Sequence, residues 1–397
     1  MRVFISGSSN EPVGLLDCLR SAPQGAAGVT FVQFPLAGLN TIDLTALHPD
    51  TRMETFFATP ALRDGMQSGR VRFLPMQMRA IYAYLSGQAF DVVLIQAARD
   101  RSGVLRLGPN VDFVGAALHR ARQVVVEINE GIVAPAGSPQ LPLARADFAV
   151  TTQRAFVALR CEIDEAARAV GRHVRELVRD GDCIQTGIGA IPAAILGALD
   201  EKSDLGMHSG LIDDAGYALI ERGVINGSRK PLDARLHIAG SVLGSRALLD
   251  ALAQRPDVVL RGADYTHEVG IIGKLPNFVS INSAVEVDLL GQVNAEYAGG
   301  RQLSGTGGSV DFMRAARVSP GGRSIVAMNA TARGGAVRGS SPAWNSLRRC
   351  VPNVDLVVTE FGVADLRHRD VESRARALID IAAPPFRDAL TAQWRAR

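Results

Sequence analysis

The chain has 397 residues, of which 47% are hydrophobic and 21% are charged, and its formal net charge is +3. This length and composition predict a globular protein with two or more domains, each large enough to have its own core. The basic residues are mostly arginines spread along the chain rather than clustered with aromatic residues, which argues against a nucleic-acid-binding surface.

The four cysteines, Cys18, Cys161, Cys183 and Cys350, form no CxxC pair and match no zinc-site spacing. The histidines also lack metal-ligand spacing. We therefore expect reduced thiols, no bound metal and a cytoplasmic location. The apolar run at the N-terminus is too short for a signal peptide, and no stretch approaches the ~18 apolar residues of a membrane-spanning helix. We expect no membrane partner.

In the first half, short apolar strands alternate with helical segments. Strands are predicted at residues 3–6, 29–34, 70–75, 90–96, 123–127 and 148–150, and helices at 15–19 and 76–85. This order predicts an α/β fold with an open, largely parallel sheet, in which loops at the carboxyl ends of the strands hold ligands. A helix predicted at residues 162–178 separates an N-terminal α/β domain, residues 1–160, from a C-terminal α/β domain, residues 161–397.

The second half begins with a strand at residues 183–185, a glycine-containing loop at 186–192 and a helix at 193–199. Such a loop presents backbone N–H groups to a ligand, although an ordinary strand–helix turn fits the pattern equally well. No Gly-Lys-Ser/Thr follows, so it is not a Walker loop, and Pro192 replaces the third glycine of a dinucleotide fingerprint. Further strands are predicted at residues 235–239, 257–260, 278–281, 285–289, 324–327 and 355–359, and helices at 215–222, 245–253, 311–317, 372–381 and 385–395.

Residues 278–312 contain the strongest chemical signal. Residues 285–289 alternate apolar and acidic side chains, which predicts a half-buried strand with Glu286 and Asp288 on its polar face. The glycine-rich run 304–309 then precedes a helix, and its amides can stabilise developing negative charge. A carboxylate beside such a loop suits covalent acyl transfer, whereas a solvated strand face beside a simple turn is the alternative. Glu296 is a second candidate nucleophile.

Several longer motifs occur in order after residue 180. They are GIGAIPAAIL (187–196), LGMHSGLIDD (205–214), ERGVING (221–227), VSINSAVEVDLLGQVNAE (279–296), SGTGGSVDFMRAA (304–316), VVTEFGVADLR (357–367) and RARALIDIA (374–382). On these motifs the chain resembles the acetyl-CoA hydrolase/transferase family, close to the 4-hydroxybutyrate and butyrate CoA-transferases. The first 150 residues resemble the family mainly in their α/β pattern.

The resemblance implies a class I CoA-transferase fold with two α/β halves and an active site between them. It also implies that CoA moves from a short-chain acyl-CoA to a free carboxylic acid through a covalent glutamyl-CoA thioester, with Glu286 as the nucleophile. CoA is then a substrate, no cofactor is permanently bound, and a homodimer is expected. A thioester hydrolase and a CoA-binding protein without turnover are the alternatives.

The same resemblance suggests roles for the loops. We expect the amides of Gly307 and Gly308 to support the oxyanion, as amides in such loops do in other acyl-transfer sites. The loop with Gly187, Gly189, Ala190 and Ile191 would line the thiol end of CoA. His208 and Ser209 are expected in the acyl pocket.

Two positions depart from the family pattern. Gly210 stands where relatives usually carry a glutamate, and Ala383 stands where they usually carry a histidine. These departures leave the acyl group and the acceptor open.

Overall fold

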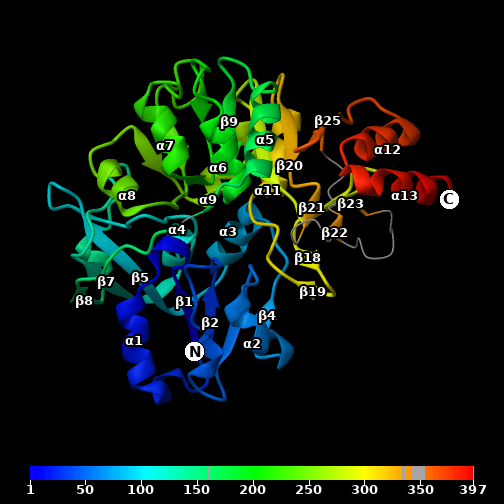
Figure 1. Cartoon of the computed structure of the whole chain (residues 1–397). Coiled ribbons are helices and arrows are strands. Elements are labelled where there is room, and N and C mark those ends of the chain that lie inside the picture. Colours follow the sequence, from blue (N-terminus) through cyan, green and yellow to red (C-terminus); the bar gives the residue numbers. More distant parts are fainter. Residues whose placement is uncertain (160, 333–336, 339, 342–353, 397) are drawn as a thin grey trace.

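The computed structural model describes residues 1–159, 161–332, 337–338, 340–341 and 354–396. Cys350 and residue 160, at which we expect the domain boundary, lie outside these residues. Two open sheets lie in two lobes, one coloured blue to cyan and the other mainly green to orange (Figure 1). This arrangement confirms the predicted α/β class with two mostly parallel sheets.

The first lobe is built on a sheet with the strand order β4-β3-β2-β1-β5-β7-β8, in which neighbouring strands are parallel. The strands are β1 (Arg2–Ile5), β2 (Thr30–Gln33), β3 (Arg52–Thr55), β4 (Val71–Phe73), β5 (Phe90–Arg99), β7 (Ala121–Asn129) and β8 (Phe148–Thr152), and β6 (Leu105–Arg106) pairs antiparallel with β5. The helices are α1 (Val13–Ser21), α2 (Arg63–Gln67), α3 (Met78–Ser86) and α4 (Val114–Leu118).

Strand β3 is absent from the sequence prediction because its charged residues conceal it. Its Glu54 is buried, and the carboxylate pairs with Arg2 at 2.5 Å and with Arg72 at 3.3 Å. These ion pairs satisfy a charge that would otherwise be costly in a strand interior.

The second lobe has a sheet with the order β10-β9-β15-β20-β24-β25, and only its edge pair, β24 with β25, is antiparallel among the described strands. The strands are β9 (Cys183–Thr186), β10 (Gly206–Met207), β15 (Phe278–Ser283), β20 (Arg323–Ala327), β24 (Leu356–Thr359) and β25 (Gly362–Asp365). The helices are α5 (Glu165–Arg175), α6 (Ala190–Gly197), α7 (Asp214–Glu221), α8 (Arg246–Leu252), α9 (Ala263–Thr266), α10 (Val269–Ile272), α11 (Ser309–Val318), α12 (Val371–Asp380) and α13 (Pro384–Arg395).

Short strand pairs complete the second half. They are β11 (Leu211–Ile212) with β13 (Ser241–Val242), β12 (His237–Ala239) with β14 (Val258–Leu260), β16 (Glu286–Asp288) with β17 (Val293–Asn294) and β23 (Ser340–Ser341), β18 (Tyr297–Ala298) with β19 (Arg301–Gln302), and β21 (Thr331–Ala332) with β22 (Val337–Arg338). In Figure 1, β18 and β19 extend from the upper lobe toward the lower one.

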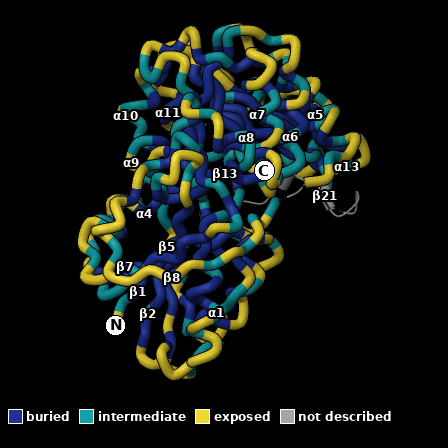
Figure 2. The backbone as a smooth tube through the Cα atoms, turned by 90° about the vertical axis from the view of Figure 1, so that its left-hand side faces the viewer, coloured by how far each residue is buried: buried dark blue, intermediate teal, exposed yellow. Residues whose placement is uncertain are grey.

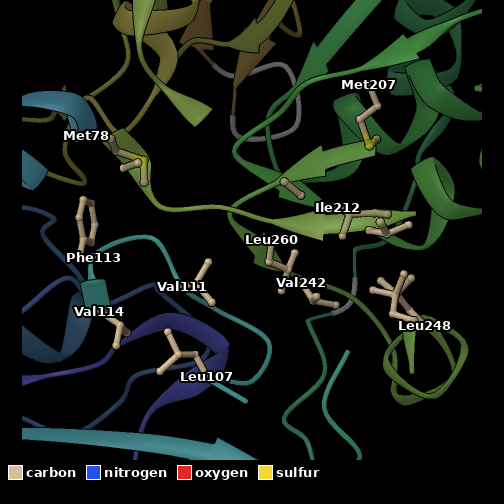
Figure 3. Close-up of a cluster of buried hydrophobic side chains, with 14 of the residues drawn as sticks. Met78, Leu107, Val111, Phe113, Val114, Met207, Ile212, Val242, Leu248 and Leu260 are labelled. Atoms are coloured by element: carbon tan, nitrogen blue, oxygen red, sulfur yellow. The ribbon is translucent and has the colours of Figure 1, made fainter. Parts of the chain in front are cut away.

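One hydrophobic core continues from the first lobe into the second. Its members include Val111 and Phe113 from the first lobe and Met207, Val242 and Leu260 from the second (Figure 3). Buried residues likewise run through the interior of both lobes in Figure 2. Because the lobes share this core, the loops that meet between them are held in fixed positions.

Candidate functional site

A cavity of about 290 Å³ lies between the two lobes. The first half contributes Ser8, Phe34, Leu36, Phe57, Met78 and Asp112. The second half contributes Gln185, Thr186, Gly187, Ile188, Gly210, Leu211, Ser241, Leu243, His267, Asn282, Ser283, Ala295 and Phe312, together with residues 304–309. The cavity is therefore largely apolar with a few polar groups, as small-molecule sites commonly are.

Polar side chains lie where β9 and β15 end. Asn282 Nδ2 donates to Gln185 Oε1 at 3.0 Å and to Ser280 Oγ at 2.9 Å, and Gln185 Nε2 donates to Asn282 Oδ1 at 3.2 Å. Because β9 and β15 are adjacent parallel strands, their carboxyl ends meet at one sheet edge. The sequence analysis did not select these residues, although both lie in or directly after a predicted strand.

The glycine-rich run 304–309 forms the loop that leads into α11. Gly307 has φ +53°, and its carbonyl accepts a hydrogen bond of 3.3 Å from Met78 N in the other lobe. Within the described part of the chain, neither the Gly307 nor the Gly308 N–H donates to an acceptor. Both glycines line the cavity, so two free amides at a helix N-terminus are available to an oxyanion.

Close packing around His267 explains why position 308 is a glycine. A Cβ atom added there would lie 2.3 Å from His267 Nε2 and 2.9 Å from the Phe312 ring. Burial lowers the pKa of His267 to about 3, so the imidazole is neutral near pH 7. A neutral ring in this corner does not compete with the loop for an anion.

The loop after β9 is only partly in the cavity. Gly187 and Ile188 line it, whereas Ala190 and Ile191 do not and instead form the first turn of α6. Gly189, with φ +114°, precedes that turn and lines a neighbouring cavity of about 340 Å³ that also includes Ile188. The predicted contacts of Gly189, Ala190 and Ile191 with CoA stay predictions.

His208 and Ser209 are fully buried and are not among the described residues that line the cavity. His208 Nε2 lies 3.2 Å from the Thr266 carbonyl, and burial lowers the pKa of this histidine to about 4. The next residue, Gly210, is the one that reaches the cavity. Neither His208 nor Ser209 lines the cavity, so their role in the acyl pocket stays a prediction.

Glu286 lies on β16, opposite Asn294 of β17, and is half-buried. It is not among the described residues that line the cavity, although Ser283, three residues earlier, is. Asp288 is structural, since it accepts hydrogen bonds from Leu290 N at 3.0 Å and from Gln292 N at 2.8 Å. The nucleophilic role of Glu286 stays a prediction.

Asp112 is a further cavity residue that the sequence analysis did not select. It lies between β6 and α4, in a segment without periodicity, and its backbone is fixed by the other lobe. Its carbonyl accepts from Ala263 N at 2.8 Å, and the preceding residue, Val111, donates to the Gly240 carbonyl at 3.0 Å. Burial raises the pKa of Asp112 to about 7.

A second cavity has a volume of about 270 Å³. It is lined by Thr59, Pro60, Arg63, Met66, Gln67, Arg301, Gln302 and Leu303. Arg63 and Arg301 make this cavity basic, whereas no Lys or Arg occurs among the described residues that line the first one. Leu303, which lines the second cavity, is followed directly in the chain by Ser304, which lines the first.

Comparison with known proteins identifies the family. The model of the acetyl-CoA hydrolase/transferase N-terminal domain matches residues 1–159, and that of the C-terminal domain matches residues 244–394. The chain belongs to the acetyl-CoA hydrolase/transferase family. This match confirms the predicted family and, with the named relatives, the predicted enzyme class of CoA-transferase.

Among members of the acetyl-CoA hydrolase/transferase family, the 4-hydroxybutyrate coenzyme A transferase of Clostridium kluyveri is 33% identical over all of this chain and 94% of its own length. A crystal structure of RipA from Yersinia pestis has a TM-score of 0.91 and 26% identity, covering all of this chain and 93% of that one. The structure of 4-hydroxybutyrate CoA-transferase from Porphyromonas gingivalis has a TM-score of 0.83 and 27% identity, covering all of this chain and 94% of that one. The predicted CoA-transferase type of fold is therefore confirmed.

Among the described residues, no group of three or more His, Cys, Asp or Glu side chains is arranged to hold a metal ion. In the same part of the chain, no helix is both long and apolar enough to span a membrane. The expected homodimer and cytoplasmic location stay predictions.

Proposed function

We propose that this member of the family transfers CoA from a short-chain acyl-CoA to a free carboxylic acid, with the thioester bound between the two lobes. The observation that carries the proposal is the pair of free amides at Gly307 and Gly308, which lie on the wall of the interlobe cavity. Attack on a thioester places negative charge on its carbonyl oxygen, and fixed N–H groups in a dry site stabilise that charge.

The composition of the cavity supports an acyl group as the occupant. Phe34, Leu36, Phe57 and Met78 form an apolar wall, and its volume of about 290 Å³ suits a short acyl chain together with the thiol end of CoA. The phosphates of CoA would need cations, which the adjacent cavity with Arg63 and Arg301 offers. CoA would then extend past Leu303 and Ser304 from one cavity to the other.

A glutamyl-CoA thioester on Glu286 is a narrower prediction within this function. It requires the Glu286 carboxylate to enter the cavity from β16, whose described position lies outside the lining. Replacing Glu286 by Gln and measuring transfer tests this requirement directly.

The test of the function is a matrix of acyl-CoA donors and carboxylic acid acceptors, with each acyl-CoA product read by mass spectrometry. We expect new acyl-CoA species that depend on enzyme and acceptor. Release of free CoA that does not depend on the acceptor would instead support the hydrolase that the family description includes. Binding of CoA by calorimetry without either product would support a CoA-binding protein and refute transfer.

The variant Gly307→Ala sharpens this test. The φ of +53° at Gly307 favours glycine, so alanine should disturb the loop that carries the two amides. Gly307→Ala should lower kcat by about 10- to 100-fold if the loop amides hold the oxyanion. The matched control is Gly299→Ala, which also has a positive φ, +58°, but lies in the β18–β19 turn with no atom within 4 Å of an added Cβ. It should keep the transfer rate.

A further inference from the structure

A further cavity, of about 230 Å³, lies in the first lobe, and all the described residues that line it belong to positions 8–157. We call it the first-lobe cavity. Its polar lining residues are Ser8, Ser9, Glu11, Gln96, Asn129 and Arg154. Among the described residues, Ser8 is the one that it shares with the interlobe cavity, so the two cavities are neighbours with separate walls.

The first-lobe cavity lies where the order of the first sheet reverses. Strand β1 has β2 on one side and β5 on the other, and the carboxyl ends of strands at such a point commonly bind ligands. Gln96 belongs to β5, and Asn129 is the last residue of β7. Asn129 Nδ2 donates to Gln96 Oε1 at 3.0 Å, and Gln96 Nε2 donates to Asn10 Oδ1 at 3.0 Å. These bonds fix the polar side of the cavity.

Glu11 places a buried carboxyl without a cation in this cavity. It is 8% exposed, and its Oε1 accepts a hydrogen bond of 2.8 Å from Gln33 Nε2. The amide of Asn40 is its other hydrogen-bond partner, and no Lys, Arg or His of the described chain forms an ion pair with it. Burial raises the pKa of Glu11. A buried carboxylate is normally paired, so this one lacks a positive partner.

Arg154, the other charged residue among those described in the lining, does not supply that partner. Its Nη2 pairs with Asp17, and its Nε lies 3.7 Å from the buried Glu127. Arg20 also pairs with Asp17, at 3.4 Å. This cluster of two carboxylates and two guanidinium groups is electrically balanced. An ionised Glu11 therefore leaves the site with one excess negative charge.

The rest of the lining defines the other needs of a ligand. Ser9 Oγ is buried and has no hydrogen-bond partner among the described residues. Leu39 and Phe156 contribute apolar surface, and Val157, which is 52% exposed, lies where the cavity reaches the surface. A ligand should thus bring hydrogen-bond donors for the Glu11 carboxylate and Ser9 Oγ, a positive charge and an apolar body. An ammonium group has three donors and no acceptor.

We propose that the first-lobe cavity binds a small organic compound with a primary ammonium group and an apolar body, separately from acyl-CoA. The ammonium group donates to the Glu11 carboxylate and to Ser9 Oγ, and the hydrocarbon body packs against Leu39 and Phe156. The positive charge cancels the excess negative charge of the site. A carboxylate or phosphate ligand would meet a charge of its own sign, which is unfavourable. This inference does not depend on the proposed function.

Three probes with one carbon skeleton test the charge preference. n-Butylammonium, n-butanol and butane-1-sulfonate are titrated into the full-length protein at pH 8 and equal ionic strength, with calorimetry as the readout. We expect one site for n-butylammonium and at least about tenfold weaker binding of the other two, because charge-assisted hydrogen bonds are the stronger ones. Saturating CoA should leave the affinity unchanged.

Two results of these titrations would overturn the proposal. Equal or tighter binding of butane-1-sulfonate would show that the cavity does not select a cation. Displacement of n-butylammonium by CoA would place the probe in the CoA site. Neither result bears on acyl transfer, which the donor and acceptor matrix measures without these probes.

Variants locate the site. Glu11→Gln keeps the size of the side chain and should weaken n-butylammonium binding at least about tenfold, and Ser9→Ala should weaken it about two- to tenfold. Asp112→Asn is the matched control, because Asp112 is also a buried carboxyl with a raised pKa but does not line this cavity. It should keep the affinity. Wild-type affinity in a folded Glu11→Gln protein refutes the proposal, and if that variant does not fold, wild-type affinity in Ser9→Ala refutes it.

Discussion

Asp112 and Glu286 are two carboxylates in contrasting surroundings. Glu286 belongs to a sequence motif of the family but lies on a short strand outside the cavity lining, and it is half-buried. Asp112 belongs to an inconspicuous loop, yet the other lobe fixes it in the cavity with one oxygen unpaired. The contrast teaches that a sequence motif identifies a family, whereas the tertiary structure decides which groups share one desolvated space.

The largest expected effect is that of Glu286→Gln. The proposed glutamyl-CoA thioester needs a carboxylate at this position, so the change should lower kcat for transfer by on the order of 10³-fold or more, because the amide cannot form the anhydride. Steady-state kinetics with one acyl-CoA and a saturating acceptor measures the loss. A drop of less than about tenfold would place the Glu286 side chain outside the covalent chemistry.

A smaller effect should follow from Gly240→Ala. The added methyl group would lie 2.0 Å from Asp112 Oδ1, so the Asp112 side chain must shift and change the shape of the cavity wall. We expect about a 100-fold loss in kcat and a decrease of about 1–3 kcal/mol in the free energy of unfolding. Chemical denaturation, together with the transfer assay, checks both quantities.

The control for that change is Gly197→Ala, at the end of α6, where an added Cβ meets no atom within 4 Å. It should raise the free energy of unfolding by about 0.5–1 kcal/mol and leave kcat unchanged. Equal losses of activity in the two variants would mean that Gly240 has no special relation to Asp112.

These variants also mark what the sequence could and could not predict. The motifs correctly predicted the family and two α/β lobes, because strands, helices and the glycine loops between them have recognisable local patterns. Gly187, Gly307 and Gly308 line the cavity, and their roles toward CoA and the oxyanion stay predictions. Asp112 has no such pattern. Its segment is held at the site by hydrogen bonds from Val111 N to the Gly240 carbonyl and from Ala263 N to the Asp112 carbonyl, and both partners are more than 100 positions away in the chain.

The burial of polar residues in strands is equally hard to predict from the sequence. Glu54 lies inside the first sheet because Arg2 and Arg72 pair with it, and the Gln185–Asn282 pair lies at the edge of the second sheet because β9 and β15 are adjacent. Strand adjacency and long-range ion pairs are properties of the tertiary fold. A local alternation of apolar and polar residues does not encode them.

The pH dependence of transfer should distinguish Asp112 from its neighbours. Burial raises the pKa of Asp112 to about 7, so kcat/KM should fall as pH increases through that value, because an ionised carboxylate on the cavity wall repels the negative charge that develops on the thioester oxygen. His267, with a pKa of about 3, does not titrate in this range, whereas burial raises the pKa of Asp311 and of Asp213 to about 6. The difference between wild-type and Asp112→Asn profiles isolates the contribution of Asp112.

The stability of the protein should also fall as pH rises. The folded state holds a proton on Asp112 up to about pH 7, whereas the unfolded chain releases it near the ordinary value of 3.8. Between these pH values the folded state binds more protons than the unfolded chain. The free energy of unfolding of the wild type, relative to that of Asp112→Asn, should therefore fall by up to about 1.4 kcal/mol per pH unit as pH rises. A constant difference in unfolding free energy from pH 4 to pH 7 would contradict the burial of a neutral Asp112.

The smallest expected effect is that of Asp112→Asn at pH 6. Burial raises the pKa of Asp112 to about 7, so its carboxyl is mostly protonated at this pH and asparagine matches it in size and charge. The transfer rate should stay within about twofold of wild type, which corresponds to about 0.4 kcal/mol in the barrier. Kinetics over the same donor and acceptor pair measures this. If Asp112→Asn instead abolishes transfer while Glu286→Gln does not, the assignment of Glu286 is wrong and the buried carboxyl of the cavity wall takes part in the chemistry.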